Sequence, residues 1–260
     1  MPGFSVAAQT RCLAGSLKKA LHIAAELGCH GVQIEARHEL RSADLSETGV
    51  RQLRKILSDL NLRVGSVVFP TRRGYANPVD LEPRLEATRQ AMGLAALLQS
   101  RIFLCNLGIV PTAESVDLRS TLVEALTSLA SHGNRIGVQL VAQTTVSDLA
   151  ELVEFISSLP EGTLSLDLHP ARLIARGRSP ADFVAAAGRF IAHVHATDGV
   201  YDLGSGRGVE VELGRGSAEF PELIGMLEEH AYRGWLTIER TDSQETISEI
   251  ANAVRYLYSM

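Results

Sequence analysis

The sequence predicts an α/β protein folded as a single (β/α)8 barrel that spans residues 1–260. Two observations carry this prediction. Short apolar runs alternate strictly with longer amphipathic segments along the chain, and eight such units in about 250 residues are the usual size of this barrel. Residues able to bind a metal follow the apolar runs of the last third of the chain, as the C-terminal ends of barrel strands would require.

Each element is assigned from its apolar periodicity and its flanking residues. We expect strands at residues 4–9, 31–35, 62–69, 101–106, 136–142, 164–169, 190–198 and 234–239. We expect helices at residues 16–28, 80–99, 114–132, 147–158, 220–230 and 243–258, one that begins near Asp44 or Ser46 and reaches residue 60, and one that begins at Ser179 with Pro180. Residues 70–78 and the glycine-rich stretch 204–216 are expected to be loops.

Strict alternation requires parallel strands joined by right-handed crossovers. The main alternative is an open, doubly wound sheet. It is less favoured because no Gly-x-Gly-x-x-Gly pattern follows the first strand and because the metal-binding types of residue lie on late, neighbouring strands. The chain has no low-complexity tract or linker, which favours one domain.

Composition excludes several classes of protein. Hydrophobic residues make up 45% of the chain and charged residues 21%, so a large core can form and disorder is not expected. The net charge is −5 and no basic stripe is present, which argues against nucleic acid or an anionic membrane as a partner. Three scattered cysteines, and no apolar run long enough to cross a bilayer or resemble a leader, predict a cytoplasmic protein.

The candidate site lies at the ends of three successive predicted strands. Asp167, His195 and Glu239 occupy these ends, and each can bind a divalent cation. Taken singly, Asp167 or Glu239 is more readily explained by a turn cap or by an ion pair with Arg172 or Arg240. Their common placement at strand ends favours a shared metal site.

Three motifs in the second half of the chain carry a resemblance to a known family. They are His193-Val-His195-Ala-Thr-Asp198, the segment 213–221 that reads Leu-Gly-Arg-Gly and then Phe-Pro, and Gly234-Trp-Leu-Thr-Ile-Glu239. In order and spacing the chain resembles the xylose-isomerase-like barrel superfamily of sugar isomerases and epimerases. That superfamily also includes inosose dehydratases and family-2 apurinic endonucleases. The resemblance implies one divalent cation (Mn, Zn, Co or Mg) held by Gln143, Asp167, His195 and Glu239.

The chain departs from the family pattern at two places. The fifth strand ends in Gln143-Thr144 where the family has Glu-Asn, and the sixth strand reads Asp167-Leu-His169-Pro170 where the family has Asp-x-Gly-His. Glutamine cannot titrate, so it cannot serve as one of two acid–base carboxylates. A neutral Gln143 also leaves only two negative ligands, which predicts a weak metal site or none.

The resemblance implies a metal-dependent sugar isomerase or epimerase that acts on a sugar or sugar phosphate through an ene-diolate. Glu239 and His169 are the predicted catalytic residues. The predicted substrate contacts are Glu35, His169, Asn106 and Arg207.

Other interpretations stay open. An inosose-type dehydratase shares the first step of the reaction, and a catalytically degenerate sugar-binding or scaffold barrel is what Gln143 would suggest. An ion pair with Arg37 is the alternative role for Glu35, and His193 is expected to lie deeper in the barrel than His195. A three-zinc endonuclease is disfavoured because the extra His and Glu ligands and a basic charge are missing. Homo-oligomerisation is left open.

Overall fold

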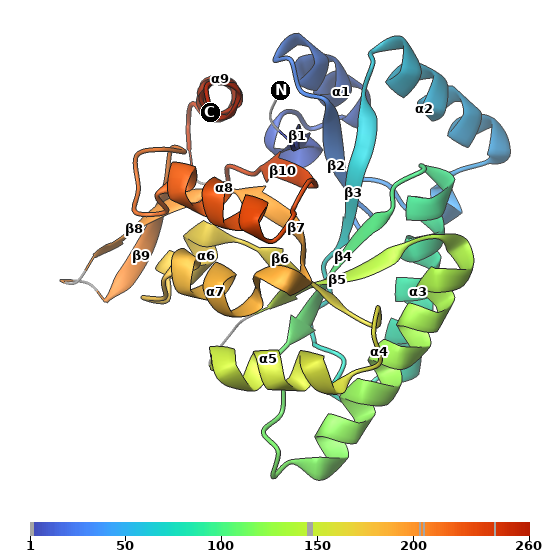
Figure 1. Ribbon diagram of the computed structural model, residues 1–260. Coiled ribbons are helices and arrows are strands. Elements are labelled where there is room, and N and C mark those ends of the chain that lie inside the picture. Colours follow the sequence, from blue (N-terminus) through green and yellow to red (C-terminus); the bar gives the residue numbers. More distant parts are fainter. Residues whose placement is uncertain (1–2, 145–147, 203, 205, 242) are drawn as a thin grey trace. The chain divides into compact units, whose positions relative to one another are not determined.

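The computed structural model describes residues 3–144, 148–202, 204, 206–241 and 243–260, and Figure 1 shows strands alternating with helices along the chain. Within these residues, eight parallel strands close into a barrel in the order β1-β10-β7-β6-β5-β4-β3-β2. The predicted (β/α)8 architecture is therefore confirmed. No helix in the described ranges has both the length and the apolar character needed to cross a membrane.

By its internal contacts the chain divides into two compact units, each assembled from separate stretches of sequence. The first unit comprises Met1–Gln33, Leu57–Gly65 and Leu168–Met260. The second unit comprises Ile34–Ile56 and Ser66–Asp167.

The first unit contains the predicted site residues His169, His195, Arg207 and Glu239. The register places Ala7 of β1 (Ser5–Gln9) beside Thr237 of β10 (Trp235–Ile238), and Thr237 beside His195 of β7 (Ile191–Ala196). The other side of β1 pairs with β2 (Gly31–Glu35). The helices belonging wholly to this unit are α1 (Leu17–Glu26), α6 (Pro170–Ile174), α7 (Pro180–Ala187), α8 (Phe220–Glu229) and α9 (Thr246–Tyr258).

Capping side chains fix two of these helices where the sequence predicts them. The Ser16 side chain accepts a hydrogen bond from the Lys19 backbone N–H at the start of α1. At the start of α7, Ser179 accepts from the backbone N–H of Asp182 and Pro180 occupies the first turn.

The second unit continues the parallel sheet through strands rich in buried aliphatic and aromatic residues. Val67 of β3 pairs with Phe103 of β4, which pairs with Leu140 of β5, and Ala142 pairs with Leu166 of β6. The bounds are β3 Arg63–Phe69, β4 Ile102–Gly108, β5 Gln139–Thr144 and β6 Ser165–Leu168. The helices are α2 (Glu47–Asp59, which begins in this unit), α3 (Leu81–Leu97), α4 (Val116–Ile136) and α5 (Leu149–Ser158).

The boundary between α4 and β5 differs from the prediction. The helix was expected to end at residue 132, but it continues to Ile136 and the strand begins only at Gln139. Gly133 is a packing residue inside the helix, because a Cβ there would lie 2.3 Å from the Val138 carbonyl oxygen. Gly137, with φ of +74°, is the residue that ends the helix. Ser147, the predicted start of the next helix, lies outside the described residues.

The prediction that residues 204–216 form a loop is wrong in part. Asp198–Asp202 (β8) and Arg207–Val211 (β9) form an antiparallel hairpin, which Figure 1 shows in orange beside α6. This hairpin packs closely against the end of α6. A Cβ added at Gly208 would lie only 2.2 Å from the Ala175 Cα, so no side chain fits there. The short helix α6 was also not predicted.

Candidate functional site

Three side chains of the first unit converge on one point. His195 lies on β7, Glu239 follows the last residue of β10, and His169 follows β6. The Glu239 Oε2 atom lies 3.4 Å from His169 Nε2 and 3.5 Å from His195 Nε2. One ligand atom from each of the three residues falls within 4.8 Å of the other two. The structure therefore brings together two residues predicted as metal ligands and the predicted catalytic histidine.

The two imidazoles are held by packing and hydrogen bonds. The rings of His169 and His195 stack with centroids 4.8 Å apart and an interplanar angle of 26°. His169 Nδ1 lies 3.1 Å from the Thr197 hydroxyl, which also accepts a hydrogen bond from the Ala171 backbone N–H. His193 is fully buried, with its Nε2 2.8 Å from the Thr237 hydroxyl. These contacts fix the ring planes before any ligand binds.

Two buried polar atoms at this point have no hydrogen-bond partner among the described residues. They are Glu239 Oε2 and His169 Nε2, which face each other without the geometry of a hydrogen bond. Burying such atoms unsatisfied costs free energy. A bound cation would remove that cost for both atoms.

The charge state of the cluster suits a cation. Burial and the nearby Arg172 guanidinium lower the pKa of His169 to about 4. Burial alone would raise the pKa of Glu239, but its contact with His169 and the positive potential of His195 outweigh burial and bring that pKa to about 2. At neutral pH His169 is a neutral imidazole and Glu239 is a carboxylate, which are the forms that bind metals.

The distances fit a common metal ion. Nitrogen and oxygen ligands lie about 2.1 Å from zinc and similar ions, so two ligand atoms on one ion are separated by less than about 4.2 Å. Glu239 Oε2 satisfies this limit with both His169 Nε2 and His195 Nε2. Glu239 is only 11% exposed, so a cation here would be largely shielded from water.

The other two predicted metal ligands lie in the second unit and contact each other. The Gln143 side-chain amide is 3.5 Å from Asp167 Oδ2, and Asp167 is buried. In the register of β5 with β4, Gln143 lies beside Asn106. Their role as ligands of the same cation remains a prediction.

The predicted substrate contacts have structural partners of their own. The buried Glu35 carboxylate accepts hydrogen bonds from the backbone N–H groups of Arg37 and His38, so it caps the turn after β2. Asn106 accepts from the Gly108 N–H at a bulge in β4. Arg207 is exposed and pairs in register with Asp202, at the opposite end of the hairpin from Asp198.

Two further residues lie near the cluster: Arg172, which the sequence suggested only as an ion-pair partner, and Gln33, which it did not identify. An Arg172 guanidinium nitrogen lies 3.8 Å from Glu239 Oε1, and this side chain is 45% exposed. The Gln33 side-chain amide lies 3.3 Å from His195 Nε2 and is fully buried. The sequence did contain a signal for Gln33. Gln33 and Glu35 are polar residues two positions apart on one strand, so their side chains point to the same face.

A comparison with family profiles matches residues 21–260 to the family described as xylose isomerase-like TIM barrel. A search of curated proteins finds no match.

Solved structures of similar fold cover nearly the whole chain. A xylose isomerase domain protein from Planctomyces limnophilus has a TM-score of 0.85 at 22% identity, with 99% of this chain and 96% of that chain covered. A xylose isomerase-like TIM barrel protein from Mycobacterium smegmatis in complex with magnesium has a TM-score of 0.80 at 18% identity, with 100% and 97% covered. A D-allulose 3-epimerase from Methylomonas sp. in complex with D-allulose has a TM-score of 0.76 at 17% identity, with 98% and 96% covered.

Proposed function

The chain belongs to the xylose isomerase-like TIM barrel family, and we propose that it is a divalent-metal-dependent sugar isomerase or epimerase. The observation that carries the proposal is the convergence of His169 and His195 on the Glu239 carboxylate, one oxygen of which is buried and has no hydrogen-bond partner among the described residues. His195 and Glu239 would hold the cation. Gln143 and Asp167 complete the proposed ligand set, as the sequence predicts.

The neighbours support the proposal at the level of ligand class. One solved neighbour is a complex with magnesium and another is a complex with D-allulose. A ketose has a carbonyl next to a carbon that bears both a hydroxyl and a hydrogen. Such a carbon is the chemical unit that a metal site with an adjacent carboxylate can epimerise.

The proposed reaction divides the work among this chain's residues. When bound, the cation supplies Lewis acidity toward the substrate carbonyl and its neighbouring hydroxyl. Glu239 takes the proton from the carbon next to the carbonyl, and the electron pair left behind makes the ene-diolate. Return of a proton to the same carbon from the opposite face inverts its configuration. His169 is the residue proposed on the donor side, because Gln143 cannot give up a proton: its neutral ring would hold the water that protonates the carbon, and the hydroxide left behind would be neutralised by the proton that Glu239 releases.

The substrate is proposed to be a small sugar or sugar phosphate. Glu35, Asn106 and Arg207 remain its proposed contacts. Arg172 can also contact the substrate, because it is partly exposed and lies next to Glu239. All three cysteines are free, so we propose a reducing, cytoplasmic setting.

Solvent deuterium exchange tests the function directly. Ketohexoses and their phosphates are incubated in D₂O with the manganese-loaded protein, and deuterium at the carbon next to the carbonyl is followed by NMR. We expect exchange and an epimer in the parent, and at least a hundredfold slower exchange in Glu239→Gln. The exposed Glu228→Gln on α8 is the control and should match the parent.

The outcome also separates the alternatives. Exchange accompanied by loss of water from an inosose-like ketone would identify a dehydratase. Metal binding without exchange on any ketose would identify a sugar-binding or scaffold barrel and contradict the proposed reaction.

A further inference from the structure

A stretch rich in arginine lies beside the Glu239 carboxylate. Residues 168–181 contain three arginines and no Asp or Glu, in a chain whose net charge is −5. Two of these arginines are linked: Arg172 lies on α6, and the Nη1 group of Arg176, in the turn that follows, donates to the Arg172 carbonyl oxygen over 3.1 Å. The positive charge is therefore local to this part of the first unit and is not a property of the whole chain.

Arg172 contacts the side of Glu239 that is closer to solvent. Its Nη2 atom lies 3.8 Å from Glu239 Oε1, whereas the other oxygen, Oε2, is buried and lies 3.4 Å from His169 Nε2. The Arg172 side chain is 45% exposed and the Glu239 side chain only 11%. A molecule that reaches Glu239 from solvent therefore passes close to the Arg172 guanidinium.

The two guanidinium groups keep hydrogen-bond donors for a ligand. At 3.8 Å the contact of Arg172 with Glu239 is too long for a hydrogen bond, and the Arg172 side chain makes none with any residue that the structure describes. Arg176 donates to a carbonyl, and no carboxylate in the described ranges forms an ion pair with it. The planar fork of N–H donors on each side chain suits the paired oxygens of a phosphate or carboxylate.

The β8–β9 hairpin brings another arginine near this turn. Gly208 lies against Ala175, and the residues next to these two in sequence are the exposed Arg207 and Arg176. Asp202 lies opposite Arg207 in the register, so part of this charge is balanced. Arg207 is therefore an auxiliary contact, and Arg172 and Arg176 carry the argument.

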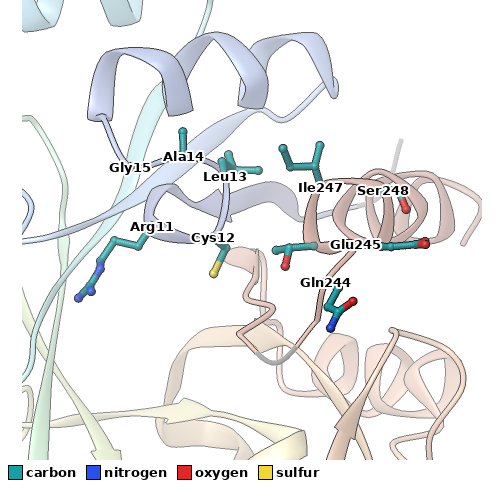
Figure 2. Close-up of a pocket in the computed structure, with 10 residues that line it drawn as sticks. Arg11, Cys12, Leu13, Ala14, Gly15, Gln244, Glu245, Ile247 and Ser248 are labelled. Carbon is teal, nitrogen blue, oxygen red and sulfur yellow. The ribbon is translucent and has the colours of Figure 1, made fainter.

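A hollow elsewhere in the first unit is less suited to an anion. Arg11, in the segment after β1, lines this hollow of about 550 Å³. Figure 2 shows Arg11 and Cys12 on one side of it and Gln244 and Glu245, just before α9, on the other. The Glu245 carboxylate opposes an anion there. Arg11 is therefore a control for the arginines beside Glu239.

We propose that Arg172 and Arg176 form an anion subsite beside Glu239, and that the sugar bound there carries a phosphate or carboxylate group. The inference rests on the proposed function and narrows its substrate class to anionic sugars. A role for Arg172 as a counter-charge to Glu239 alone does not account for Arg176. Because Arg172 lies so close to Glu239, the anionic group lies within a few carbon atoms of the carbon that Glu239 deprotonates.

The first test is the preference of the manganese-loaded protein among matched ketoses. D-Fructose, its 1- and 6-phosphates and D-fructuronate differ in whether and where they carry an anionic group. The value of kcat/KM for solvent deuterium exchange is measured for each. We expect at least one anionic ketose to exceed fructose by about a hundredfold or more, because charge-assisted hydrogen bonds to arginine are strong. The preferred ketose identifies the group as phosphate or carboxylate.

Two variants assign the preference to the arginines. Arg176→Gln removes a charge, and Arg172→Lys keeps the charge but loses the planar fork. Each should lower the ratio of kcat/KM for the preferred ketose to that for fructose by about tenfold or more. A general loss of activity cancels in this ratio. Arg11→Gln is the matched control and should keep the parental ratio.

Thermal unfolding of the metal-free protein gives a readout that needs no reaction. Without a metal ion, an anionic ketose cannot bind through the cation. We expect the preferred ketose to raise the melting temperature of the parent and of Arg11→Gln, and fructose at the same concentration to leave it unchanged. Arg176→Gln should lose the rise.

The outcomes separate this inference from the proposed function. Equal kcat/KM for fructose and the anionic ketoses, or a parental ratio in both arginine variants, would overturn the subsite while the proposed reaction stands. Absence of stabilisation by any anionic ketose in the parent would also overturn it. A rise in melting temperature that depends on Arg176, in a protein that exchanges no ketose, would support the subsite and contradict the proposed function.

Discussion

Glu239 is a carboxylate with one buried oxygen that faces two imidazole nitrogens and accepts a hydrogen bond from neither within the described residues. Burial opposes its charge, and the surrounding positive potential more than offsets that effect, as its pKa of about 2 indicates. A carboxylate of this kind is ready to bind a cation at any pH near neutral. The other proposed ligands, Asp167 and the neutral Gln143, would decide how many negative charges the proposed site carries.

At Gln143 we predict that restoring the carboxylate strengthens the proposed site. Gln143→Glu should tighten divalent-metal binding about tenfold, roughly 1.4 kcal/mol, because a charged oxygen replaces an amide oxygen. It should also destabilise the metal-free protein at neutral pH, because the new carboxylate lies next to Asp167. Calorimetric titration and thermal unfolding measure the two effects.

The matched control is Gln139→Glu, at the exposed start of the same strand, which should change neither quantity. Equal metal affinities for Gln143→Glu and the parent would mean that Gln143 does not face the cation.

His169 predicts a specific pH dependence of stability in metal-free protein. Its pKa is 6.5 in an unfolded chain and about 4 when folded beside Arg172, Glu239 and His195. As the pH falls from 6.5 toward 4, the unfolded chain gains a proton that the folded protein excludes, so the free energy of unfolding declines by up to roughly 3 kcal/mol. Below about pH 4 this decline ends. Glu239 contributes only at lower pH, as its carboxylate protonates between 4.5 and about 2.

Urea unfolding between about pH 5 and 6.5 separates the His169 contribution from that of Glu239. We expect His169→Gln to flatten the decline in this range and His22→Gln, on α1, to leave it intact. A parent whose stability is level from pH 6.5 to 5 would show that His169 is not held neutral by the fold.

At the scale of elements, one carboxylate organises the segment between β7 and α8. Asp198, which is buried, accepts hydrogen bonds from the backbone N–H groups of Gly199, Gly214, Gly216 and Ala218. These bonds tie the loop after β9 to the first residue of β8. Asp198, the last residue of the His-x-His-x-x-Asp motif, therefore stabilises the segment that follows β7.

We predict that Asp198→Asn costs about 2–4 kcal/mol of stability, because the amide offers one acceptor oxygen where the carboxylate offers two charged ones. The melting temperature should fall by roughly 5–15 °C. Asp202→Asn lies at the exposed end of the hairpin, where the side chain accepts from the Gly204 N–H, and should shift it by far less. Equal melting temperatures for Asp198→Asn and the parent would remove this role from Asp198.

The elements that sequence reasoning predicted are those with a strong period and a clear cap. The helix begun by Ser179 and Pro180 and the strands that carry His195 and Glu239 belong to this group. The β8–β9 hairpin was missed because its glycines, such as Gly208, suggested a loop. Gly208 is needed there because β9 lies against the Ala175 backbone, which is information about packing that a periodic pattern does not contain.

At the scale of the whole molecule, the order of strands followed from alternation, because parallel strands joined by helices allow few other arrangements. The ends of the late strands then identified His169, His195 and Glu239, which the structure does bring together. Gln33 could not be placed from the sequence, because its contact with His195 joins residues 162 positions apart through the register of several strands. The strand and helix pattern and the types of candidate ligand can be read from short stretches of sequence. The side chains that surround each ligand come from distant stretches and cannot.

The central claim is that Glu239 and His195 bind one divalent cation. It is tested most directly by calorimetric titration of chelator-treated protein with Mn²⁺ or Mg²⁺. The account predicts one ion per chain, a rise in melting temperature with metal, and at least about tenfold weaker binding in Glu239→Gln, with Glu228→Gln unchanged. Absence of binding at millimolar cation, or equal affinity in Glu239→Gln, would contradict it.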